Sequence, residues 1–444
     1  MKLRNLMYAT MIACAFASCS NDDVPTPDQG GVEADGTTLA LRFDQPLTKA
    51  GGDNEINHLA VLVFNGAGNK SIKLEKIGIA ESNILSQSEV KQTKLTPGNK
   101  TVLVLANAKA EVAKFEEGTT TYEDVLAAET ESYSSLTETV DPLLMGDLSM
   151  NSKAYEVTLK ANVTNYLGYG LEGSDKNGNY LPQAGEKPVK LYRNVAKIVL
   201  KEVKVKEEVA NGYQYPNATL KLKEIFILHG HNSSKLVGAE GAAWGTTNVV
   251  SSYVNGQISS VYNEYLKLVD ETNKIFNYME EQGYAYSAKL IQSFYSPSLE
   301  GGLPVVSVDE AYKPVSSEMN AFYTYENTSG EDGIQTLLVV KGDFSYDGIK
   351  EGDTDASRIE EKDRYYSFAI GNTGKVNETV PADFVGLRAD DKIHGVMRNL
   401  QYNTTITVTG PGYKTPVGPK YDETFLDVEV EVVPFGEVNQ DVEI

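Results

Sequence analysis

The chain has 444 residues, of which 41% are hydrophobic and 23% charged, and 62 acidic against 40 basic residues give a formal net charge of −22. The length suits about two or three globular domains. The excess of negative charge repels phosphate backbones and argues against nucleic acid as a partner. Both cysteines, Cys14 and Cys19, lie near the N-terminus, so disulfides and cysteine-bound metals are excluded from the rest of the chain.

The N-terminal stretch has the order of an export signal. Lys2 and Arg4 come first, a short apolar run follows, and the run ends in F-A-S-C at Cys19. That run is too short to span a membrane, and the polar residues after it would be costly to bury in lipid. We therefore predict a signal peptide at 1–18 and lipidation of Cys19, palmitate included. An ordinary secretory signal is the alternative.

The first strand expected beyond the signal lies at 37–47, where apolar residues alternate with others. Alternation of this kind predicts a half-buried strand. The inward residues are Leu39, Leu41 and Phe43, and the outward ones are Ala40 and Arg42. A polar, Gly-rich loop, T-K-A-G-G-D-N, follows the strand. Because such a loop exposes its backbone and Lys49 supplies a side chain for specificity, we predict a protease site there.

Further apolar runs bounded by turn-forming residues predict a mainly β protein. The runs lie at 57–65, 101–108, 154–163, 189–206, 218–229, 335–344, 364–371 and 402–409. Those at 189–206 and 218–229 alternate apolar with basic residues, which predicts one wet face for each. Two helices are expected, a short capped one at Val125 and Leu126 and a longer one at 259–282, where apolar residues recur at helical spacing.

The turn-rich segment N-G-N-Y-L-P-Q-A-G-E-K-P at 177–188 separates two strand-rich blocks, so we place a domain boundary there. The expected domains are 50–186 and 187–444. At the far end, F-L-D-V-E-V-E-V-V-P-F-G-E-V-N-Q-D-V-E-I alternates valine with glutamate and then continues. An open-ended strand of this kind, at about 424–444, is unusual in a monomer. Its apolar residues are Val428, Val430, Val432, Phe435, Val438, Val442 and Ile444.

Motifs for chemistry are weak. G-Y-G-L-E-G at 168–173 has the spacing of a nucleotide loop but precedes S-D-K-N-G-N and no helix. His229 and His231 could point to one face of a strand, but no third metal ligand is near them in the sequence. Acidic pairs are expected by chance among so many carboxylates, and no nucleophile motif is present. We predict no catalytic residue, no metal and no cofactor.

Four segments together resemble the FimA-type fimbrillins, the subunits of type V pili of the Bacteroidales. H-L-A-V-L-V-F-N-G-A at 58–67 is similar to the family's first mature strand, and T-P-G-N-K-T-V-L-V-L-A-N at 96–107 to its next core strand. V-K-L-Y-R-N-V-A-K-I-V-L-K-E-V-K-V at 189–205 resembles the strand that opens the second domain. The most specific match is R-N-L-Q-Y-N-T-T-I-T-V-T-G-P-G at 398–412.

The resemblance implies two transthyretin-like β-sandwich domains, export as a lipoprotein, and removal of the N-terminal strand within a propeptide at 19–49. Lys49 and Ala50 lie where the family has an Arg-Ala cleavage bond. It also implies polymerisation by strand exchange into a fimbria at the cell outer membrane and extracellular surface. The implied partners are like subunits, accessory anchor and tip subunits, a processing protease, and a host protein or glycan receptor.

Physical chemistry supports that order of events. Loss of a sheet strand exposes unpaired backbone groups and an apolar groove that a neighbour's strand can fill. Three alternatives stay open: an anchor or tip subunit, a monomeric surface adhesin or glycan-binding lipoprotein that uses the chain's 26 tyrosines, and an enzyme.

Overall fold

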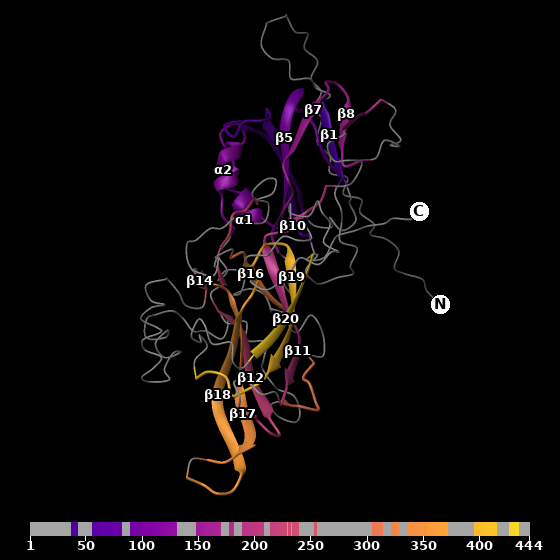
Figure 1. Cartoon of the computed structure of the whole chain (residues 1–444). Helices are drawn as coiled ribbons and strands as arrows, with labels where there is room; N and C mark the ends of the chain where they lie inside the picture. Colours follow the sequence, from indigo (N-terminus) through magenta and orange to yellow (C-terminus); the bar gives the residue numbers. More distant parts are fainter. Residues whose placement is uncertain are drawn as a thin grey trace, which may run out of the picture. The chain divides into compact units, whose positions relative to one another are not determined.

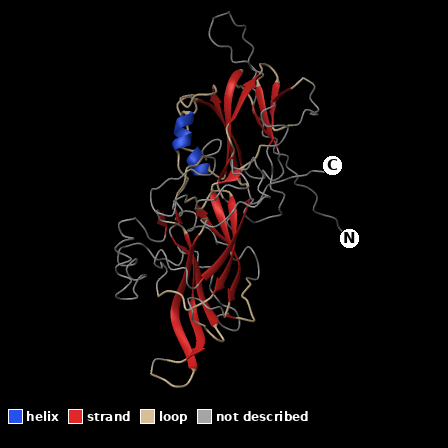
Figure 2. Ribbon diagram, in the orientation of Figure 1, coloured by secondary structure: helices blue, strands red, loops and turns tan. Residues whose placement is uncertain are grey.

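The computed structural model is mainly β, and the residues that it describes include two short helices (Figures 1 and 2). All residues that it describes belong to one compact unit, Ala34–Ile444. No helix among them is long and apolar enough to cross a membrane. The described residues are 37–42, 56–81, 89–130, 148–169, 177–181, 189–207, 214–228, 230–231, 233–238, 253–254, 304–313, 321–327, 335–350, 352–371, 395–414 and 426–434.

The first half of the chain forms two sheets. One has four strands in the order β4-β1-β8-β9, and the other has six, in the order β10-β6-β5-β2-β3 with β7 also paired to β5. Their bounds are β1 Thr38–Arg42, β2 His58–Asn65, β3 Leu74–Glu81, β4 Glu89–Gln92, β5 Gly98–Ala106, β6 Met150–Asn151, β7 Tyr155–Leu159, β8 Thr164–Leu167, β9 Asn179–Leu181 and β10 Tyr192–Arg193.

These two sheets pack face to face on a shared apolar core. Leu39, Leu41 and Leu167 from the four-stranded sheet meet Val61 and Val104 from the six-stranded sheet. The opposite face of the six-stranded sheet is buried as well, beneath helices α1 (Lys109–Val112) and α2 (Tyr122–Ala127). Burial on both faces explains why β2 and β5 read as continuous apolar runs without alternation.

The second half forms another β-sandwich, again from two sheets. Their orders are β14-β13-β16-β11-β19-β20 and β15-β12-β17-β18. Ile198, Phe322 and Ile406 from the first of these sheets share one core with Leu220 and Val340 from the second. The bounds are β11 Val195–Val205, β12 Thr219–Leu228, β13 Gly230–His231, β14 Tyr253–Val254, β15 Val305–Ser307, β16 Ala321–Tyr325, β17 Leu337–Gly348, β18 Ser357–Ala369, β19 Leu400–Val408 and β20 Leu426–Pro434.

The short capped helix predicted at Val125 is confirmed as α2. Thr121 is its N-cap: the Thr121 hydroxyl accepts a hydrogen bond from the Asp124 backbone N–H, and the Asp124 carboxylate accepts one from the Thr121 backbone N–H. This reciprocal pair satisfies two backbone donors that a helix start otherwise leaves unpaired. The longer helix predicted at 259–282 lies outside the described residues.

The wet face predicted for 189–206 is wrong for the first half of β11. Val195–Leu200 are all buried, including Lys197, because β11 lies inside its sheet between β16 and β19. Lys197 Nζ lies 5.7 Å from the centre of the Tyr323 ring, so the cation keeps an attractive partner. β10 belongs to the first sandwich and β11 to the second, so the chain passes from one sandwich to the other at Asn194.

Candidate functional site

The strand before the predicted cleavage loop lies inside its sheet. β1 pairs in antiparallel fashion with β4, from Leu39 opposite Gln92 to Arg42 opposite Glu89. On its other edge it pairs in parallel with β8, from Thr38 opposite Thr164 to Leu41 opposite Leu167. Removing β1 would therefore leave two strand edges without their hydrogen-bond partners.

The side chains of β1 are deeply buried. Leu39 and Leu41, predicted to face inward, are both 0% exposed. The prediction that Ala40 faces outward to solvent is wrong, because Ala40 is also 0% exposed. Phe43, the third residue predicted to face inward, lies outside the described residues.

Asn165 on β8 forms a hydrogen bond with the start of β1. Its side-chain Nδ2 donates to the Thr38 carbonyl at 3.1 Å, and also to the carbonyls of Lys160 and Val163 at 3.1 and 3.2 Å. Asn165 is 0% exposed, so these bonds satisfy a polar group that burial would otherwise penalise. Sequence reasoning missed this residue, since an asparagine after a turn gives no sign that it braces a distant strand.

The predicted donor strand is already paired within its own chain. β20 lies at one end of its sheet and runs antiparallel to β19, from Leu400 opposite Pro434 to Val408 opposite Leu426. Val430 is half-buried and packs against the core of the second sandwich. In this form the strand is held in cis, where an open end was expected from the sequence.

Several predicted residues have no described position. Cys19, Lys49 and Ala50 lie outside the described residues, as do the last four apolar residues of the predicted donor strand. Val428, Val430 and Val432 lie on β20. The roles assigned to all of these residues stay predictions. The last four residues are Phe435, Val438, Val442 and Ile444.

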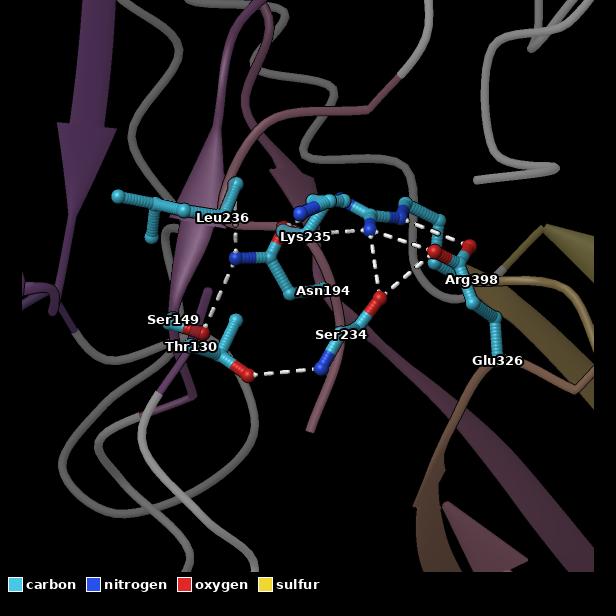
Figure 3. Close-up of polar contacts among 8 residues, drawn as sticks. All are labelled: Thr130, Ser149, Asn194, Ser234, Lys235, Leu236, Glu326 and Arg398. Carbon is cyan, nitrogen blue, oxygen red and sulfur yellow. Dashed lines mark hydrogen bonds and ion pairs between the residues drawn. The ribbon is translucent and has the colours of Figure 1, made fainter. Parts of the chain in front are cut away.

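A buried ion pair joins two strand ends of the second sandwich (Figure 3). Arg398 Nε donates to Glu326 Oε2 at 2.9 Å, and Arg398 Nη2 donates to Oε1 at 2.6 Å. Both side chains are 0% exposed. Ser234 adds a hydroxyl hydrogen bond to Glu326 at 2.6 Å, and Arg398 donates to Asn194 Oδ1 at 3.0 Å. Burial raises the pKa of Glu326, and the neighbouring guanidinium opposes that shift.

The same group of residues reaches the first half of the chain. Asn194 Nδ2 donates to Ser149 Oγ at 3.1 Å. Ser234 N donates to Thr130 Oγ1 at 3.1 Å, and Thr130 N donates to the Ser234 carbonyl at 2.8 Å. Figure 3 shows these contacts in one continuous set. We call the eight residues drawn there the polar hub. They are Thr130, Ser149, Asn194, Ser234, Lys235, Leu236, Glu326 and Arg398.

The described residues offer little for catalysis. No three His, Cys, Asp or Glu among them are close enough to hold a metal ion. His231 is buried beside the hub, and this burial lowers the pKa of its imidazole. His229 and most of the Gly-rich segment at 168–173 lie outside the described residues.

Comparisons with known proteins find similar chains. A family model described as major fimbrial subunit protein (FimA) matches residues 36–193. The major fimbrium subunit FimA type-2 of Porphyromonas gingivalis is 23% identical over 453 residues, which cover 99% of each chain. The FimA type-3 protein of the same organism is 24% identical over 460 residues, covering 100% of both chains.

Solved structures share the fold. A Parabacteroides distasonis protein assigned to cell adhesion is 24% identical, has a TM-score of 0.57, and covers 90% of this chain and 98% of its own. A fimbrilin (FimA) from Porphyromonas gingivalis is 18% identical, has a TM-score of 0.52, and covers 92% of this chain and 100% of its own. The family model over residues 36–193 and the full-length relatives together show that the chain is similar to the FimA fimbrillins.

Proposed function

We propose that this chain is a structural, non-enzymatic subunit of a cell-surface fimbria that supports adhesion and biofilm formation. It is exported as a lipoprotein on Cys19, cleaved between Lys49 and Ala50, and polymerised by strand exchange. The observation that carries the proposal is the position of β1. This strand lies on the N-terminal side of the cleavage loop, yet it is an interior strand of a sheet, and its three central residues, Leu39 to Leu41, are buried.

Cleavage would make the subunit competent to assemble. Loss of β1 uncovers the edges of β4 and β8 and an apolar floor that includes Val61 and Val104. A strand with apolar residues at every second position can refill that groove, as Val428, Val430 and Val432 are spaced on β20. Each such side chain contributes about 1.5–3 kcal/mol on burial, and each ladder hydrogen bond adds about 0.5–1.5 kcal/mol. Burial therefore dominates the hold between subunits.

Release of β20 from β19 is the second requirement. The strand cannot pair with its own β19 and with a neighbour through the same backbone edge at once, so polymerisation exchanges one ladder for another. The net gain comes from filling the vacated groove of the neighbour. Because this chain has a full C-terminal strand to give, a stalk subunit is favoured over a tip subunit. An anchor subunit would keep its lipid and its β1.

The test is limited proteolysis of the purified precursor followed by gel electrophoresis in SDS without heating. The expected result is N-terminal sequence starting at Ala50 together with SDS-resistant ladders. Lys49→Ala should block both, whereas Lys350→Ala, in the exposed turn between β17 and β18, should block neither. Deletion of 424–444 should leave cleavage intact and abolish the ladders. Ladders that form equally well without 424–444 would rule out this donor strand.

A further inference from the structure

Lys100 has an unusual environment for a lysine. It lies on β5, directly opposite Asn65 of β2, and its side chain is 0% exposed. Its Nζ donates to Asn65 Oδ1 at 2.8 Å, to Thr96 Oγ1 at 2.5 Å, and to the carboxylate of Glu75 on β3. Lysines are almost never fully buried, and here the three contacts use all three ammonium protons.

Lys100 lies on the core side of its strand, whereas Asn65, at the end of β2, is exposed. Along β5, Lys100 continues the row of Val102, Val104 and Ala106, which all belong to the core shared with β1. Glu75 is 15% exposed and accepts hydrogen bonds from Thr96, at 2.6 Å from the backbone N–H and 2.9 Å from the hydroxyl. Its carboxylate is therefore held in place against the amine.

From this geometry we propose that Lys100 and Asn65 become joined by a side-chain amide bond, with Glu75 as the proton carrier. The amine, the amide and the carboxylate are the three groups that the reaction needs, and the fold brings all three together on neighbouring strands. Asn65 Cγ is bonded directly to Oδ1, the atom that Lys100 already contacts. Holding a nucleophile against its target in this way replaces a collision with an intramolecular step.

The atoms balance without any further reagent. Lys100 first gives one proton to Glu75, which leaves a lone pair on Nζ. Nζ then bonds to Asn65 Cγ, and the bond between Cγ and Nδ2 breaks. A second proton passes from Nζ to the departing Nδ2, which leaves as ammonia. Glu75 then returns the first proton to give ammonium, and the products are a secondary amide and an unchanged carboxylate.

A competing reaction of Asn65 shapes the test. Asn65 is followed by Gly66, whose φ is +129°, and the backbone N–H of such a glycine can attack the same Cγ to give a cyclic imide. That reaction also releases ammonia, so a loss of mass alone does not identify the cross-link. The two products differ in connectivity. The proposed bond joins two strands, whereas the imide stays within one.

Tryptic peptide mapping of the denatured full chain by mass spectrometry distinguishes them. Trypsin cuts after Lys and Arg, so Asn65 belongs to peptide 50–70 and Lys100 separates 95–100 from 101–109. The cross-linked lysine resists trypsin. The expected product is one branched species that joins 50–70 to 95–109 and lacks one ammonia. Separate recovery of unmodified 50–70 and 95–100 from the folded protein would overturn the proposal.

Variants give the controls. Lys100→Arg keeps the charge but removes the amine nucleophile, so the branched species should disappear. Glu75→Gln should abolish or greatly slow its formation. Asn65→Asp should give a branched species of the same mass, because it loses water where the native chain loses ammonia. Lys76→Arg, in the surface pair with Glu117 at 3.6 Å, should change nothing. Two results together would refute the cross-link and assign the cyclic imide. They are an absence of the branched species in the native chain, and a loss of ammonia confined to peptide 50–70 in Lys100→Arg.

Discussion

Arg398 and Glu326 meet through two hydrogen bonds, at 2.9 and 2.6 Å, with both side chains fully buried. Arg398 lies two residues before β19, the strand that pairs with β20, and Glu326 directly follows β16. Through Asn194 and Ser234 the pair also reaches residues of the first half of the chain. The polar hub therefore links residues of both halves of the chain through hydrogen bonds.

Removing one member of this pair should be strongly destabilising. Glu326→Ala leaves a guanidinium buried without its counter-charge, and we expect a loss of about 3–5 kcal/mol in the free energy of unfolding. Urea denaturation measures it. Lys76→Ala, in the exposed pair with Glu117, is the matched control and should cost about 1 kcal/mol or less. Equal losses of unfolding free energy in the two variants would contradict the prediction, because the buried pair would then contribute no more to stability than the exposed pair.

Stability should fall in mild acid because of His231. Burial lowers the pKa of its imidazole below the ordinary value of 6.5, so at lower pH the unfolded chain binds a proton that the folded chain resists. The contribution of His231 is therefore present above pH 6.5 and is lost as pH falls through its folded pKa. Unfolding free energies measured across this range for the native chain and His231→Gln should converge at low pH. Parallel curves for the two proteins would contradict the prediction.

Leu41 should matter to the precursor but not to the polymer. Leu41→Ala leaves a cavity in the shared core, which we expect to cost the uncleaved chain about 2–5 kcal/mol. After cleavage the residue is gone, so assembled material should melt at the native temperature. Val104→Ala, on the floor of the same groove and retained after cleavage, should weaken both forms. Calorimetry of precursor and polymer checks this, and a weakened Leu41→Ala polymer would show that β1 stays in place.

The apolar face of β20 should control assembly. A double substitution of Val428 and Val430 by Asp places charge on the residues expected to fill the groove, and we expect SDS-resistant ladders to disappear after cleavage. Glu429→Gln on the exposed side of the same strand should assemble normally. Circular dichroism of each precursor separates failed assembly from failed folding. If the folded double variant still formed normal SDS-resistant ladders, the donor strand would have to be a segment other than β20.

Local patterns predicted the strands and the cap well. β2 and β5 follow from continuous valine and leucine runs that end in turn residues, and α2 follows from Thr121 with an acidic residue three positions later. Each of these signals involves residues within a few positions of one another, where spacing along the chain and position in space agree. The burial of Ala40 and Lys197 was not predictable in this way, because it depends on which strands lie beside β1 and β11.

The sequence by itself determined the class of the molecule: a mainly β chain that resembles the FimA fimbrillins, with an alternating strand at each end. Tertiary structure alone decided that β1 is an interior strand, that β20 is held by β19, and that Arg398 meets Glu326. It also brought Lys100 to Asn65 and Glu75. The side-chain contacts among these join residues 25 to 72 positions apart, and their formation depends on sheet order and register, which no local pattern specifies.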